Sequence, residues 1–285
     1  MRIDNKNQFK LIFELSTTQK WIVTKQEALY HLLFSECDTD DKRKLIVELL
    51  GRFTHITNEK YSELTQKLVS NIISINGISD ETTQVVAMAA DSGSDSSQRV
   101  LYDLKLIFEQ MNWREYKHVN QFGSAYRTYK SSPKHKNIVL IDEFIGSGRS
   151  AIGRVNSIKE QFSNAKIEDY KIYVRTLIAM QDGIKALIDA GIDVQALVLL
   201  EKGITDYSPK DQIADQIDLM RLLEKNLSQA YNDREMPSLG YGETESLYTR
   251  DGGNTPNNVF PIFWWPFFSD GTCRQVLLHR AMRDA

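Results

Sequence analysis

Apolar side chains recur at helical spacing in the first part of the chain. One stripe occupies residues 45–53 and a second occupies residues 61–72, and each predicts an amphipathic helix. Gly51 and Asn58 lie where the two helices would be separated. We therefore expect residues 1–80 to be helical, either as a small subdomain or as a helix-turn-helix-like module with a surface for a partner.

From Thr83 onward, short apolar runs alternate with amphipathic stretches of helix length. Four of these runs have the length and composition of buried strands, at 85–90, 137–144, 172–180 and 194–203. Strands that are apolar throughout and separated by helices imply a parallel sheet covered on both faces. The predicted fold class is α/β, in which ligands bind at the carboxyl ends of the strands.

The pattern changes again after the last predicted strand. Ser208 and Pro209 suit the cap and first position of a helix whose apolar stripe extends to Leu227. From Pro237 the chain is rich in glycine and asparagine and then in aromatic residues. We expect an α/β domain over residues 81–285, in which residues 237–285 form a hood beside the ligand-binding edge of the sheet.

Composition and charge exclude several classes of function. Thirty-five Lys and Arg against 38 Asp and Glu give a formal net charge of -3, so general electrostatic binding to nucleic acid or to an anionic membrane is not expected. Two distant cysteines indicate neither a disulfide framework nor a thiolate metal cluster, and they predict a reducing, cytoplasmic location. The longest apolar run, 259–268, contains two prolines and is too short to span a bilayer.

The segment with the clearest chemistry is residues 138–150, IVLIDEFIGSGRS. It reads as a buried strand that ends in two acids, followed by a small-residue loop that opens a helix. Adjacent carboxylates such as Asp142 and Glu143 can accept hydrogen bonds from the vicinal hydroxyls of a ribose or help to hold hydrated Mg2+.

The loop after these acids suits an anion. Gly146 and Gly148 allow a tight turn, so that backbone N–H groups at the start of the helix can point at one phosphate. Ser147 and Ser150 add hydroxyl donors, and Arg149 adds a charged one. The segment therefore predicts a sugar phosphate as ligand; the alternative is a loop that only caps a helix, with Arg149 in solvent.

Two common nucleotide motifs fit this loop poorly. The loop lacks the lysine and spacing of a Walker A motif. It meets the dinucleotide fingerprint only with Ala151 at the third glycine position, and two acids before the glycines would repel a pyrophosphate. A Rossmann dinucleotide site is therefore disfavoured.

The segment resembles the phosphoribosyl-diphosphate signature of the type I phosphoribosyltransferases. Residues 138–141 match the strand of that signature, Asp142 and Glu143 its acidic pair, and residues 147–150 its phosphate loop. The resemblance implies that the acids contact the ribose hydroxyls and that the loop binds the 5'-phosphate. The sequence departs from the pattern in having Glu as the second acid, Gly146 where a hydroxyl residue is usual, and Arg149 inside the loop.

A second loop follows the predicted strand at 85–90. By position it corresponds to the pyrophosphate loop of the resembled family, and the residues expected to serve there are Ser92, Gly93, Ser94, Asp95 and Ser96. Asp91 and Asp95 would oppose a bare anion, so this reading needs Mg2+, held through Asp142 or Asp91. The alternative reading is a hydroxyl-rich helix cap.

The stretch 114–136 carries six Lys and Arg against one Glu. In the resembled family a mobile loop at this place closes over the pyrophosphate, and a solvated basic connector is the alternative. His118 and His135 are expected to face solvent.

The C-terminal segment supplies candidates for a base pocket. Asn254, Asn257 and Asn258 could read the edge of a base, and Trp264 could stack on it, whereas burial of the tryptophan in a hydrophobic core is an equally simple account. Together with DSGSDSSQ, IDEFIGSGRS, GYG and NTPNN, this segment resembles the divergent phosphoribosyltransferase-like proteins of bacterial conflict and anti-phage systems, including retron-associated ones.

This resemblance implies an effector in anti-phage defence that binds a ribose phosphate, phosphoribosyl diphosphate with Mg2+ or a nucleotide, with Asp142 and Glu143 as the catalytic residues. Two alternatives stay open. The same pocket could sense a nucleotide without turnover and signal to a defence-system partner through the N-terminal helices, or it could hydrolyse a nucleotide N-glycosidic bond.

Overall fold

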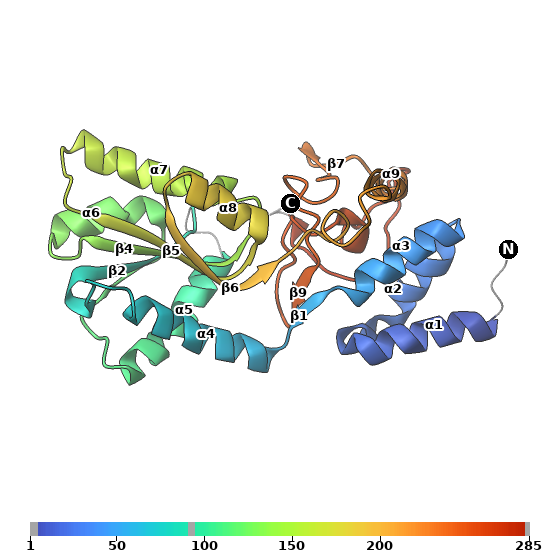
Figure 1. The fold of residues 1–285 in the computed structure, drawn as a ribbon, viewed down its shortest axis with the longest axis horizontal. Helices are drawn as coiled ribbons and strands as arrows, with labels where there is room; N and C mark the ends of the chain where they lie inside the picture. The colour runs from blue at the N-terminus through green and yellow to red at the C-terminus, as the bar shows by residue number, and fades with distance from the viewer. Residues whose placement is uncertain (1–4, 91–94, 283–285) are drawn as a thin grey trace. The chain divides into compact units, whose positions relative to one another are not determined.

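The structure is a computed structural model that describes residues 5–90 and 95–282. The chain folds into two units (Figure 1). Unit 1 combines Met1–Thr57 with Glu201–Ala285, and unit 2 is the continuous stretch Asn58–Leu200. These limits do not coincide with the expected boundaries at residues 80 and 237. The helix after Thr57 packs on the sheet, and the C-terminal segment folds with the N-terminal helices.

Unit 2 is built around a parallel sheet of five strands, which confirms the predicted fold class. The strands are β2 (Thr83–Ala87), β3 (Lys117–Val119), β4 (Asn137–Ile145), β5 (Lys171–Met180) and β6 (Asp193–Leu200). The helices are α4 (Asn58–Ile73), α5 (Ser96–Gln110), α6 (Ala125–Ser131), α7 (Arg149–Asn164) and α8 (Gln181–Asp189), with single 3-10 turns at Asp80–Thr82 and Phe122–Ser124.

The spatial order of the strands is β3-β2-β4-β5-β6. Taken in chain order this is 2-1-3-4-5, so the direction of winding reverses between β2 and β4. In open α/β sheets the crevice at such a reversal, at the carboxyl ends of the strands, is where ligands bind. The topology therefore points to the ends of β2 and β4.

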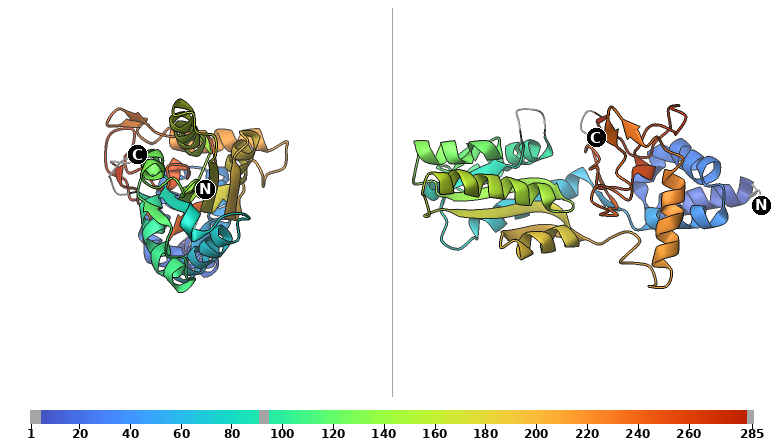
Figure 2. Two further views of the ribbon diagram at one scale, coloured as in Figure 1. Left: turned by 90° about the vertical axis from the view of Figure 1, so that its left-hand side faces the viewer. Right: turned by 90° about the horizontal axis from the view of Figure 1, so that it is seen from above.

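Helices cover both faces of the sheet (Figures 1 and 2). On one face lie α6, α7 and α8, and on the other lie α4 and α5. The core between the sheet and the first set is apolar, with Leu140 and Val174 from the strands against Val155, Phe162 and Leu187 from the helices. Burial of both faces explains why the strands read as unbroken apolar runs.

Unit 1 is held together by pairing between its two chain segments. Its elements are α1 (Asn5–Thr18), α2 (Gln26–His31), α3 (Asp40–Gly51), β1 (Thr54–Ile56), α9 (Ile213–Glu224), β7 (Ala230–Tyr231), β8 (Arg234–Glu235) and β9 (Tyr248–Arg250), with short helical turns at Lys20–Lys25, Leu32–Glu36 and Pro261–Phe263. β1 and β9 pair in parallel, and β7 and β8 form a hairpin.

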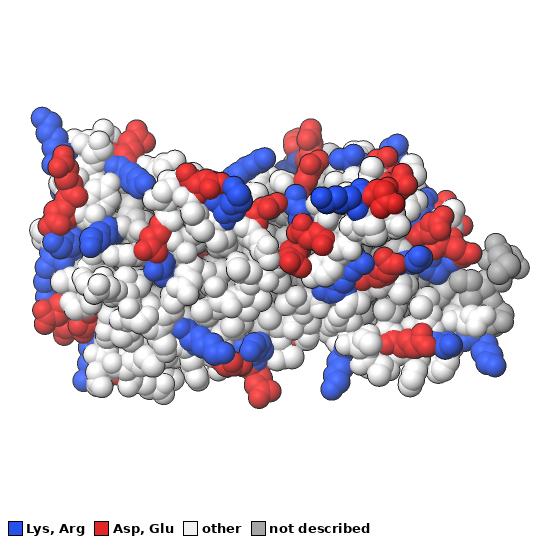
Figure 3. Space-filling model, in the orientation of Figure 1, with Lys and Arg blue, Asp and Glu red and all other residues white. Residues whose placement is uncertain are grey.

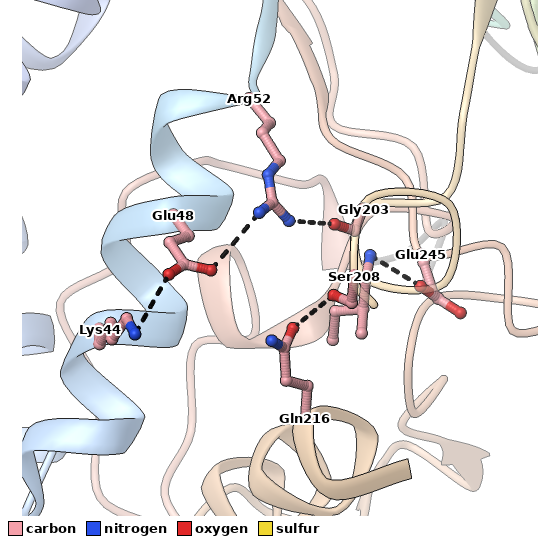
Figure 4. A network of polar contacts seen from close by, with 8 residues as sticks. Lys44, Glu48, Arg52, Gly203, Ser208, Gln216 and Glu245 are labelled. Carbon is pink, nitrogen blue, oxygen red and sulfur yellow. Dashed lines mark hydrogen bonds and ion pairs between the residues drawn. The ribbon is translucent and has the colours of Figure 1, made fainter. Parts of the chain in front are cut away.

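Polar side chains also join the two segments of unit 1. At the end of α3, Arg52 donates to the carbonyl of Gly203 at 2.8 Å and contacts Glu48 at 3.4 Å (Figure 4). The buried Glu245 carboxylate accepts from the backbone N–H groups of Ile204 and Thr205 at 2.9 and 2.8 Å. These bonds fix the turn that follows β6.

Three elements differ from the sequence prediction. The strands β1 and β3 are too short, at three residues each, to give a periodic signal. The helix predicted from Ser208 begins at Ile213. The Ser208 hydroxyl donates to the side chain of Gln216, and residues 210–212 form a turn before the helix.

We expect the loss of one partner of the buried ion pair in unit 1 to destabilise the unit strongly. Arg274, 1% exposed, contacts Glu36 at 2.7 Å and also donates to the carbonyls of Ile262 and Trp265. Replacing Arg274 with Leu leaves the Glu36 carboxylate buried without its partner, which should lower the free energy of unfolding by about 3–5 kcal/mol. Chemical denaturation followed by tryptophan fluorescence measures this.

The matched control is Arg114→Leu, which removes a solvent-exposed pair with Glu109. It should change the free energy of unfolding by about 1 kcal/mol or less. If both substitutions lower the free energy of unfolding equally, the buried pair contributes no more to stability than the exposed one.

Candidate functional site

The candidate site lies in unit 2, where β2 and β4 end at the reversal of the sheet. Asp142 is near the end of β4, the 146–148 loop joins β4 to α7, and Asp95 caps the helix that follows β2. The topology thus brings together parts of two of the loops that the sequence singled out. Ser92, Gly93 and Ser94, and Asp91 before them, lie outside the described residues.

Asp142 carries the main electrostatic signal of the site. Its side chain is 14% exposed, and one carboxylate oxygen lies 3.8 Å from the guanidinium of Arg154 on α7. Burial and, to a smaller extent, the nearby Asp95 carboxylate raise the pKa of Asp142 to about 7, although Arg154 opposes both effects. A cation or a hydrogen-bond donor placed beside Asp142 would stabilise its ionised form and lower this pKa.

Glu143 occupies a different environment from Asp142. The sequence predicts a strand over 137–144 that ends in the two acids, and β4 extends one residue further, to Ile145, which pairs with Ala179 of β5. Successive residues of a strand face opposite sides of the sheet. Asp142 therefore continues the face of Leu140, which packs towards α7, while Glu143 is 2% exposed on the other face. The pairing of both acids on one ribose stays a prediction.

The loop between β4 and α7 has the form that the sequence predicted. Gly148 adopts a left-handed conformation, with φ of 78°, and is the N-cap of α7 with no side-chain cap. The first N–H groups of a helix have no acceptor within the helix, so those of α7 are available to an anion. Gly146 and Gly148 are buried, Ser147 is half-buried, and Arg149 and Ser150 are exposed.

Gly183, in the first turn of α8, was missed in the sequence and supports this loop. A Cβ atom at Gly183 would lie 2.0 Å from the carbonyl oxygen of Gly146, and one at Gly148 would lie 2.8 Å from the carbonyl oxygen of Gly183. Backbone therefore packs on backbone, with no room for a side chain. The signal available was a lone glycine inside a predicted helix, which usually has a packing reason.

Asp95 has the capping role that the sequence left open. Its carboxylate accepts hydrogen bonds from the backbone N–H of Ser97, at 2.8 Å, and from the Ser97 hydroxyl. Ser96 is the exposed first residue of α5. The same carboxylate raises the pKa of Asp142, so Asp95 caps α5 and also acts electrostatically on Asp142.

The described residues contain no cluster of three or more His, Cys, Asp or Glu side chains that could hold a metal ion. Asp142 and Asp95 are the pair of carboxylates that interact at the carboxyl ends of the strands. Mg2+ commonly binds through one or two protein carboxylates together with water and substrate phosphates. This donor set fits a metal that arrives with a phosphorylated ligand.

The basic stretch 114–136 is not a loop throughout. It contains β3 and α6, and some of its cations have partners: Arg114 pairs with Glu109 at 2.7 Å, and Lys136 with Asp169 at 2.6 Å. On the face drawn in Figure 3, cationic and anionic side chains are interspersed. His135 was expected in solvent but is 1% exposed, because its ring bonds Ser132 and the carbonyl of Glu115.

The expected base-pocket residues lie in unit 1 and have structural contacts there. Trp264 is 1% exposed and donates to the carbonyl of Val259 at 2.8 Å, which is the core role considered as the alternative. Asn258 donates to the carbonyl of Tyr241, and the side chain of Asn254 accepts from the backbone of Ala281. Asn257 is half-buried. Their contact with a base stays a prediction.

Residues 26–269 match the model of the PRTase-CE family over most of the chain. The chain belongs to the PRTase-CE family. It is thus a phosphoribosyltransferase-like protein of conflict systems, and the resemblance seen in its motifs is confirmed.

Curated relatives of this PRTase-CE protein match over a short stretch. Xanthine phosphoribosyltransferase 1 from two strains of Clostridium botulinum is 34% identical over 77 residues, which is 26% of this chain. The chain therefore spans 38% of the length of these relatives.

Three solved structures are also similar to this PRTase-CE chain. The xanthine-guanine-hypoxanthine phosphoribosyltransferase of Helicobacter pylori has a TM-score of 0.32 and 16% identity, covering 52% of this chain and 83% of its own. The orotate phosphoribosyltransferase of Aeropyrum pernix has a TM-score of 0.31 and 14% identity, covering 56% and 76%. A hypothetical protein of Neisseria gonorrhoeae with bound ppGpp has a TM-score of 0.34 and 12% identity, covering 60% and 97%.

Helices that could cross a membrane were sought over residues 5–90 and 95–282, and none is long and apolar enough.

The raised pKa of Asp142 predicts a pH dependence of stability. Asp142 has a pKa of about 7 in the folded chain and an ordinary value of 3.8, so the folded state binds more protons between these values. The resulting stabilisation is complete below about pH 4 and is lost as the pH rises through 7. The melting temperature is measured in EDTA and without ligand. In Asp142→Asn it should vary less between pH 4 and pH 8 than in the wild type, and it should be higher at pH 8.

The control for this titration is Glu160→Gln, which removes an exposed acid from the same side of the sheet on α7. It should leave the shape of the pH profile as in the wild type. Glu224, whose pKa burial also raises to about 7, is present in every variant and cancels in the comparison. An Asp142→Asn profile that parallels the wild type would contradict the assigned environment.

Proposed function

We propose that this PRTase-CE protein binds a ribose 5-phosphate ligand, phosphoribosyl diphosphate with Mg2+ in the first instance, at the carboxyl ends of β2 and β4. One observation carries the proposal: an uncapped helix N-terminus and a buried, proton-binding carboxylate flank the same reversal of the sheet. The N–H groups of α7 suit the 5'-phosphate, and Asp142 suits a ribose hydroxyl or the metal.

The chemistry proposed is displacement at the anomeric carbon of the ribose. Mg2+ supplies charge neutralisation to the pyrophosphate when it is bound, and Asp142 with Asp95 would hold it. The 146–148 loop fixes the 5'-phosphate, and Ser147 and Ser150 add donors, so the sugar is held in one orientation. Arg154 would offer its positive charge to the leaving pyrophosphate, which gains negative charge as its bond to the anomeric carbon breaks.

A second candidate reaction is hydrolysis of a nucleotide N-glycosidic bond. The pKa of about 7 favours it, because a carboxylate titrating near neutral pH can accept a proton from an attacking water. In both reactions the biological role we propose is that of an effector in anti-phage defence, in keeping with the family. Binding without any turnover would instead identify a nucleotide sensor.

The test is a direct one with the full chain. Isothermal titration with phosphoribosyl diphosphate and Mg2+ at pH 7.5 should show binding, and Asp142→Asn with Glu143→Gln should weaken it by at least about tenfold, or 1.4 kcal/mol. Chromatography of incubations with phosphoribosyl diphosphate or with nucleotides then separates transfer, hydrolysis and plain binding. Unchanged affinity in the double variant would refute the proposed ligand geometry.

A sharper prediction concerns the support of the phosphate loop. Gly183→Ala keeps an α-helical backbone that alanine favours, yet its Cβ would press on Gly146, so the loop must move. We expect affinity for phosphoribosyl diphosphate to fall by about tenfold or more, equal to 1.4 kcal/mol. Titration calorimetry and the melting temperature are measured together.

Gly153→Ala on α7 is the matched control, since a Cβ there meets nothing within 4 Å. It should stabilise the helix by roughly 0.5–1 kcal/mol and leave the affinity unchanged. If Gly183→Ala binds as tightly as Gly153→Ala, the loop does not form the anion site.

A further inference from the structure

Unit 2 contains a groove at the edge of the sheet opposite to the candidate site. It has a volume of about 980 Å3 and is lined by the C-terminal half of α7, the start of β5 and the turn before β6. Ligand pockets in proteins commonly have volumes of about 300–1,000 Å3. The groove is therefore large enough for a small molecule of nucleotide size.

The charge in this groove is mainly positive. Lys159, Lys166 and Lys171 all line it, and in the described part of the chain none of them has an ion pair or a side-chain hydrogen bond. Other lysines on the same unit, such as Lys185 and Lys136, are paired with acids at 2.6 Å. Three unpaired ammonium groups around one cavity favour an anion.

The two acids in the groove do not cancel these lysines. Asp193 is committed to the buried guanidinium of Arg175, at 2.8 Å. Glu168 lines the groove and has no ion pair among the described residues. The charge left to an incoming ligand is therefore that of three lysines against one glutamate.

One of the lysines stands in an unusual backbone conformation. Lys166 lies two residues after the end of α7 and has a φ of 55°, in the left-handed region where glycine is usual after a helix. A lysine accepts some strain in that position, and here the strained residue lines the groove.

Apolar surface lies beside the cations. Ile167, Ile172 and Ile192 line the groove together with the ring of Tyr170, which stacks on Phe162 with ring centres 4.2 Å apart. A flat, partly apolar ring system suits this surface, and phosphate oxygens suit the lysines.

We infer that this lysine-lined groove is a second binding site, separate from the phosphate loop, for a nucleoside phosphate. The base lies against Tyr170 and the isoleucines, and the phosphates contact Lys159, Lys166 and Lys171. The site is independent of the proposed function, because it lies at the amino-terminal ends of β5 and β6 rather than at the carboxyl ends of β2 and β4. α7 extends from one site to the other over 16 residues, or roughly 24 Å.

Lysine footprinting of the full chain tests this inference at residue level. The protein is acetylated with and without ADP, and modification of each lysine is read by mass spectrometry. ADP should slow acetylation of the three groove lysines by about tenfold when the site is saturated, as expected for occupied contacts. Lys105 and Lys210, both exposed outside the groove, serve as internal references and should not change.

Two probes separate the parts of the ligand. Adenosine lacks phosphates and should give no protection, whereas pyrophosphate lacks the base and should protect only at higher concentration than ADP. Protection by adenosine alone, or equal midpoints for pyrophosphate and ADP, would overturn the assignment to a nucleoside phosphate.

A variant that should bind ADP more tightly completes the test, because a gain of affinity cannot result from loss of folding. Glu168→Gln removes the one unpaired acid from the groove, so the ADP midpoint for protection of the lysines should fall by about threefold, a change of about 0.7 kcal/mol. Glu160→Gln, an exposed acid of α7 outside the lining, should leave it unchanged. No protection by ADP in the wild type, or identical midpoints in the two variants, would refute the site.

Discussion

The contact on which the candidate site depends is between two pieces of backbone. The 146–148 loop lies against the first turn of α8 at Gly183, closer than any side chain would permit. Because α7 begins within this loop, the contact sets where its first N–H groups point. A phosphate at this place would be held by main-chain atoms, whose positions depend on glycine in two separate elements and little on the identity of the neighbouring side chains.

The second determinant is the desolvation of Asp142. Burial and a neighbouring acid hold this carboxyl close to its protonated form, and the single guanidinium at 3.8 Å compensates only in part. Such an arrangement is costly for an empty protein and favourable once a cation or a donor arrives.

Long, strongly patterned features were predictable from the sequence, and short or purely spatial ones were not. The four apolar strands, the acids, and the glycine loop before a helix were all recognisable, because each has a local chemical reason. β1 and β3 have only three residues each, which is too few to give a periodic signal. Gly183 reaches the loop because α8 packs against it, and Arg154 reaches Asp142 from α7, so spacing along the chain could not identify them. His135 was expected in solvent and Trp264 was considered for stacking on a base. Both are buried and form hydrogen bonds with neighbouring residues.

The discontinuity of unit 1 has a consequence for synthesis of the chain. All of unit 2 is one uninterrupted segment, whereas the helices before it find their pairing strand and buried arginine only in the last third of the polypeptide. A growing chain can therefore complete the sheet while still attached to the ribosome. The amino-terminal helices must wait until residues 201–285 have been synthesised, so a shorter nascent chain carries a complete sheet together with helices whose apolar faces are not yet covered.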